Sequence, residues 1–136
     1  MSMWSRRPLS ISEKSEFDEW LVQMVRKHRE FTALVLLTEI SETRVEPLCS
    51  TYFHIIGDEV AWPDIVAMFN GSGRTWHGAA FFPTSTADGG PVDAATAQMR
   101  LRELEQKVAE DRMILNKGEF FDTLGRRIKI EPLADA

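Results

Sequence analysis

The chain has 136 residues, and its 16 Lys and Arg residues against 21 Asp and Glu residues give a net charge of −5 at pH 7. The 43% of hydrophobic residues excludes a disordered chain, and the acidic balance argues against a general nucleic-acid-binding protein. The single cysteine, Cys49, excludes an intrachain disulfide framework. We therefore expect one domain over residues 1–136, with residues 1–9 as a flexible arm.

Targeting signals are weak. The longest strictly apolar run, residues 33–37, is much shorter than the roughly 20 residues needed to span a bilayer. Arg6 and Arg7 faintly match a twin-arginine export signal, but the polar residues after them exclude the apolar region that such a signal needs. We therefore expect a cytoplasmic protein that does not bind membranes. We also expect no nucleic-acid binding, because the arginine pairs are isolated and do not form a basic patch.

The first predicted element is a helix over residues 11–29. Ser10 and Glu13 have the spacing of a capping box, which predicts the start of this helix. Apolar residues then recur at spacings of three and four, as on one face of a helix (Phe17, Trp20, Leu21, Met24). The short apolar run that follows predicts a strand over residues 32–40 that is buried on both faces.

The middle of the chain predicts shorter elements. Residues 51–56 are aromatic and β-branched, so we expect a strand there, with a short helix capped by Gly57 as the alternative. A second helix is expected within residues 58–70, since Pro63 suits a first helical turn. Residues 76–83 read as a further strand.

The last third predicts the longest helix and a hairpin. After a loop over residues 84–91, a helix is expected over 92–112, with a stripe of small and apolar side chains (Ala94, Ala97, Leu101, Leu104, Val108). Two strand-like segments, 119–121 and 127–131, flank the sequence Asp-Thr-Leu-Gly, which predicts a β-hairpin with a type I turn.

The order of these elements predicts an α+β fold. We expect a four- to five-stranded mixed or antiparallel sheet, with the two main helices packed on one face and the hairpin at the C-terminus. The hairpin argues against a wholly parallel sheet, because its two strands must run in opposite directions.

The stretch 71–78, Gly-Ser-Gly-Arg-Thr-Trp-His-Gly, has the composition of a binding loop. It follows a helix and precedes a strand, whereas a phosphate loop needs a helix N-terminus after it, so a helix stop and turn is the favoured interpretation. The alternative is a ligand-binding site, in which His77 would form an acid–base pair with Asp64 or Asp58. That site would contain Asp64, Arg74, Trp76 and His77.

No motif assigns a catalytic residue, a metal or a cofactor. His28, His54 and His77 lack the spacings of metal-binding motifs, and no serine lies in a Gly-x-Ser-x-Gly sequence. Cys49 is expected to be a small buried residue. Acidic residues concentrate between positions 39 and 64, and they predict a solvated rim, with a cation site or a patch for a basic partner as the alternative (Glu39, Glu42, Asp58, Glu59, Asp64).

Three functional hypotheses follow. The first is a non-catalytic interaction protein that self-associates as a dimer, through the stripe of the long helix or the edge of the hairpin. Its candidate interface residues are Trp4, Trp62, Leu101, Leu104 and Val108. The second is a small enzyme or small-ligand binder that uses the site at residues 64–77. The third is an acidic inhibitor or immunity-type protein that binds a basic partner.

Overall fold

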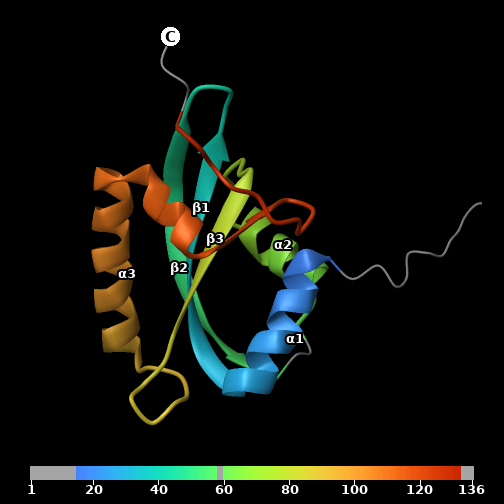
Figure 1. Ribbon diagram of the computed structural model, residues 1–136, viewed down its shortest axis with the longest axis vertical. Helices are drawn as coiled ribbons and strands as arrows, with labels where there is room; N and C mark the ends of the chain where they lie inside the picture. Colours follow the sequence, from blue (N-terminus) through green and yellow to red (C-terminus); the bar gives the residue numbers. More distant parts are fainter. Residues whose placement is uncertain (1–14, 58–59, 133–136) are drawn as a thin grey trace, which may run out of the picture.

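The computed structural model describes residues 15–57 and 60–132 (Figure 1). The elements along the chain are α1 (Glu16–His28), β1 (Glu30–Ile40), β2 (Val45–Ile56), α2 (Trp62–Asn70), β3 (Gly78–Thr84), α3 (Ala94–Glu110), the 3-10 helix η3 (Arg112–Lys117) and β4 (Glu119–Asp122). Within these described ranges, no helix is long and apolar enough to cross a membrane.

The sheet has four strands in the order β2-β1-β3-β4, and every neighbouring pair is antiparallel. The predicted α+β class is therefore confirmed, with four strands and an antiparallel arrangement. β1 lies inside the sheet between two long partners, whereas β2 forms one edge. This position of β2 matters for the site described below.

The two main helices lie on opposite faces of the sheet, so the expectation that both cover one face is wrong. Alternate residues of β1 explain the arrangement. Val35 and Leu37 pack toward α1 and α2, whereas Leu34 and Leu36 pack toward α3. A strand that is apolar on both faces needs a cover on each face. Figure 1 shows α3 on one side of the sheet and α1 with α2 on the other.

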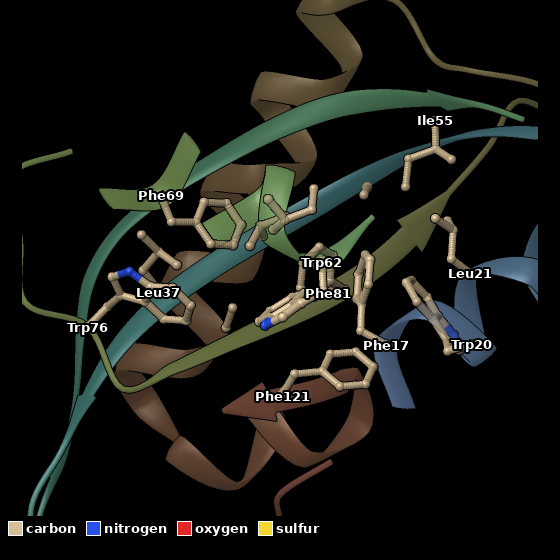
Figure 2. Close-up of a cluster of buried hydrophobic side chains, with 14 of the residues drawn as sticks. Phe17, Trp20, Leu21, Leu37, Ile55, Trp62, Phe69, Trp76, Phe81 and Phe121 are labelled. Carbon is tan, nitrogen blue, oxygen red and sulfur yellow. The ribbon is translucent and has the colours of Figure 1, made fainter. Parts of the chain in front are cut away.

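The core between the sheet, α1 and α2 is mainly aromatic. The ring of Phe17, which has no exposed surface, lies 4.8 Å from Trp62, 5.0 Å from Phe81 and 5.3 Å from Phe121, measured between ring centroids. Figure 2 shows these side chains converging from helices and strands that are distant in the sequence. The cluster under α3 is mostly aliphatic.

Both long helices begin at side-chain caps. Ser15 caps α1 and forms a capping box with Asp18, so the helix begins at Glu16, later than expected. The pair proposed from the sequence, Ser10 and Glu13, lies outside the described residues. Asp93 caps α3 by accepting a hydrogen bond from the Thr96 backbone at 2.7 Å, and this bond lowers the pKa of the Asp93 carboxyl.

The segment 51–56 is a strand, so the helical alternative is wrong. The strand also begins earlier than expected, at Val45, and includes Pro47. Pro47 lies where the register of β1 and β2 shifts, between Leu37 and Thr38. An edge strand tolerates a proline at an irregularity because its missing N–H need not pair with a neighbour.

The C-terminal hairpin is confirmed in outline, but its returning segment pairs with β4 over fewer residues than the expected strand 127–131. Gly125 has a positive φ of 77° and donates its N–H to the Asp122 carbonyl at 3.0 Å. The returning segment bridges to β4 between Arg127 and Phe121, and the Arg126 carbonyl and the Ile128 N–H also bond β4. It then leaves the sheet because the Asn116 side chain binds both backbone groups of Ile130, at 2.7 and 2.9 Å.

Candidate functional site

Two of the four residues in the expected ligand site serve the fold directly. Trp76 is buried, its ring meets Phe69 edge-on at 5.4 Å, and its indole N–H donates to Asn70 at 3.0 Å. Figure 2 shows Trp76 pointing into the aromatic core beside Phe69. Asp64 accepts a hydrogen bond from the Ala61 backbone at 3.1 Å and so caps α2.

The other two residues lie on the surface. The His77 backbone donates to the Thr38 carbonyl at 2.8 Å, and its ring Nδ1 accepts from the Ile40 backbone at 3.0 Å. His77 thereby extends the pairing of β1 and β3 by one step. Arg74 is exposed. Within the described ranges, no hydrogen bond or ion pair joins any two of Asp64, Arg74, Trp76 and His77.

Replacing His77 by alanine is expected to cost about 0.5–1.5 kcal/mol of unfolding free energy, because the Ile40 N–H loses its acceptor. Urea denaturation measures this cost, and faster amide exchange at Ile40 locates it. Arg74→Ala is the control and should change stability by less than about 0.5 kcal/mol. Unchanged exchange at Ile40 in the His77 variant would contradict the structural role.

The four expected interface residues that the structure describes lie inside the chain's own core, which corrects the prediction for them. Leu101 and Leu104 are each 9% exposed, and Val108 is fully buried, because the stripe of α3 packs on β1 and β2. Trp62 is 5% exposed and lies between Phe17 and Trp76. Trp4 lies outside the described residues.

The acidic residues do not form a metal site in the described part of the chain, where no cluster of three or more His, Cys, Asp or Glu residues could hold an ion. Glu39 and Glu42 are exposed, and Asp58 and Glu59 lie outside the described residues. Glu46, opposite Glu39 in the sheet, pairs with Arg44 at 3.1 Å. Cys49 is only half-buried.

A cavity of about 410 Å³ lies where the β1–β2 turn meets η3 and the C-terminal segment. Two arginines line it, and both already have partners in the fold: Arg44 pairs with Glu46 at 3.1 Å, and Arg112 binds backbone carbonyls. The Arg112 guanidinium donates to the carbonyl oxygens of Val45 at 2.8 Å, Val108 at 2.7 Å and Ala109 at 3.0 Å. This cavity therefore offers little free donor capacity to an anionic ligand.

The hydrogen bonds of β1 show which backbone groups of β2 face away from the sheet. The Thr38 carbonyl and the Ile40 N–H both bind His77 and so point toward β3. In antiparallel strands, alternate residues direct their backbone groups to opposite neighbours. The β2 partners of the β1 residues that face β3 must therefore direct their groups to the outer edge: Val45, Pro47, Ser50, Tyr52, His54 and Ile56.

The outer edge of β2 has a protected half and an open half. In the protected half, Arg112 occupies the Val45 carbonyl, Glu46 is charged and Pro47 has no N–H. The open half, residues 50–56, reads Ser-Thr-Tyr-Phe-His-Ile-Ile and contains no Lys, Arg, Asp, Glu or Pro. Within the described ranges, no hydrogen bond reaches its outward backbone groups.

Natural proteins usually protect edge strands with charges, prolines or covering segments, because free backbone groups pair with other chains. The open half of the β2 edge lacks these protections and ends at Ile56, whose side chain is 66% exposed. The uncharged segment was visible in the sequence, but its place at the edge follows only from the strand order.

A cavity of about 390 Å³ lies beside this edge, between β2 and the end of α2. It is lined mainly by apolar or small side chains, including Cys49, Thr51, Met68 and Phe69. The Met68 side chain is 50% exposed. Comparison with known proteins adds no constraint, since no family model, curated protein or solved structure matches the chain.

Proposed function

We propose that this protein is a non-catalytic binding protein whose binding element is the open half of the β2 edge. This edge accepts an extended strand from a protein partner. The observation that carries the proposal is the run of outward backbone groups at Ser50, Tyr52, His54 and Ile56, in a segment without charge or proline. Strand addition satisfies such groups with main-chain hydrogen bonds.

The cavity beside β2 supports the same function. In strand addition, main-chain bonds supply affinity and side pockets select alternate side chains of the added strand. Met68 and Phe69 offer an apolar wall next to Cys49 and Thr51. A methionine at a binding surface adapts to partners of different shape. The expected partner segment is therefore extended, uncharged and carries an apolar residue that faces this cavity.

Amide exchange measured by NMR tests the proposal. The probe is a synthetic peptide with the sequence of residues 50–56, flanked by lysines for solubility. The amides of Tyr52 and His54 face the open edge and should exchange quickly in dilute protein, then slow as the peptide is added. Thr51 and Phe53, which face β1, should stay slow throughout and serve as internal controls.

The proposal fails if the Tyr52 and His54 amides remain unprotected in excess peptide and at every protein concentration. Protection that spreads equally over all four strands would point to general stabilisation and would also contradict it.

A further inference from the structure

The geometry points to a second copy of this chain as the occupant of the open half of the β2 edge. This inference depends on the proposed function. Two β2 strands pair antiparallel about a twofold axis that passes through Phe53, and the two sheets join into one. A protein–protein interface between identical copies most often has this symmetry.

The outward backbone groups select the register. With the axis at Phe53, Ser50 pairs with Ile56 of the second copy and Tyr52 pairs with His54 of the second copy. All four outward residues of each copy are then used, in four pairs that exchange two hydrogen bonds each. Moving the axis to Tyr52 or to His54 leaves three such pairs. The axis at Phe53 therefore gives the longest ladder.

The side chains are compatible with that register. On the face of α1 and α2, Phe53 meets Phe53 of the second copy at the closest type of cross-strand position. On the face of α3, Tyr52 meets His54 of the second copy. The exposed Ile56 side chain of each copy then lies beside Ser50 of the other copy. The strands themselves bring no charged groups together, because residues 50–56 have no carboxylate, lysine or arginine. One carboxylate does bind this segment: Glu105 of α3 accepts a hydrogen bond from the Ser50 hydroxyl.

Helix α3 leaves room for the second copy. The Val92 backbone donates to Thr32 at 3.0 Å, and Thr32 in turn bonds His54 at 2.9 Å, so α3 begins above this end of β2. Its first turn there carries Ala94 and Ala95, which are exposed and small. Two α3 helices can therefore approach each other across the axis at this point.

Sedimentation equilibrium of the full chain tests the pairing. The mass should rise with concentration from 15.5 kDa toward twice that value. His54→Pro removes an outward N–H that β1 does not use and should weaken the pairing by at least about tenfold. His54→Ala is the matched control, since it also loses the Thr32 contact but keeps the N–H. Ile56→Lys, at an exposed position, is a second weakening variant in case the proline variant does not fold.

Cross-linking tests the register. In a Cys49→Ala background, Ser50→Cys combined with Ile56→Cys should give an interchain disulfide on oxidation, because paired Cα atoms lie about 5.5 Å apart. Either single cysteine should not cross-link with itself, since six residues of strand separate the two copies of each by about 20 Å. A mixture of the two single variants should cross-link.

The outcomes separate the two proposals. A monomeric wild-type chain whose Tyr52 and His54 amides are nevertheless protected by the peptide overturns self-pairing and leaves the proposed function standing. A monomer without protection overturns both. A dimer that survives both His54→Pro and Ile56→Lys, or that cross-links through a single cysteine, overturns the β2 pairing.

Discussion

Replacing Trp62 by alanine is expected to lower the free energy of unfolding by about 3–5 kcal/mol and to leave the association of folded molecules unchanged. The indole is 5% exposed and lies 4.8 Å from the ring of Phe17 and 6.3 Å from that of Trp76. Its N–H donates to the Thr123 carbonyl at 2.9 Å. The substitution therefore removes core volume and leaves the Thr123 carbonyl without its indole donor.

Denaturant unfolding monitored by circular dichroism measures the loss. Trp62→Phe keeps a ring but loses the bond to Thr123, so it should cost less than the alanine variant. Leu124→Ala, at a side chain that is 62% exposed, should change stability by less than about 0.5 kcal/mol. A Trp62→Ala protein that keeps its stability but associates less would restore the interface role expected from the sequence.

Gly125→Ala is expected to cost about 2–4 kcal/mol, for two separable reasons. Gly125 has a φ of 77°, which strains any residue with a Cβ atom. An added Cβ would also lie 2.8 Å from Cβ of Ser15 and 3.0 Å from Trp62. Because the Gly125 carbonyl accepts the Phe17 N–H at 3.0 Å, the clash would push the turn away from the start of α1.

Gly73→Ala is the matched control. Gly73 has a φ of 76° with nothing within 4 Å of an added Cβ, so this variant isolates the backbone strain, about 1–2 kcal/mol. The difference in unfolding free energy between the two variants measures the clash, and exchange of the Phe17 amide should accelerate only in Gly125→Ala. Equal losses of unfolding free energy in the two variants would show that the turn and α1 move apart without cost, which would contradict the predicted clash.

Local sequence signals predicted most of the elements but not the layers. The apolar run at residues 33–37 predicted a strand buried on both faces, and β1 is such a strand. The same run already required a helix on each face, a consequence that the expected one-sided arrangement overlooked. The start of β2 was not predicted because Pro47 lies within it. A proline is compatible with a strand only at a sheet edge, and the sequence does not show which strand is at an edge. The short helix η3 has too few residues for a periodic signal.

The functional residues were harder to place from the sequence. Leu101, Leu104 and Val108 make a stripe that packs equally well on another helix or on the chain's own sheet, and periodicity does not distinguish the two. Arg74, Trp76 and His77 are close in sequence, yet the structure buries one and exposes two. The open half of the β2 edge depends on which strands pair, a long-range property that no local window contains.

The opposite side of the sheet sets a limit on assembly. Most outward backbone groups of β4 are bonded within the chain, since the Ile128 N–H donates to the Phe120 carbonyl and the Asp122 N–H donates to the Arg126 carbonyl, both at 2.9 Å. In the proposed pairing, the described part of each molecule therefore offers one open strand edge, residues 50–56 of β2. When two such edges pair about a twofold axis, both are fully paired and neither can accept a third molecule. Association therefore stops at a dimer and does not continue into a fibre. If the outer edge of β4 were uncovered, a further chain could pair there and assembly could continue.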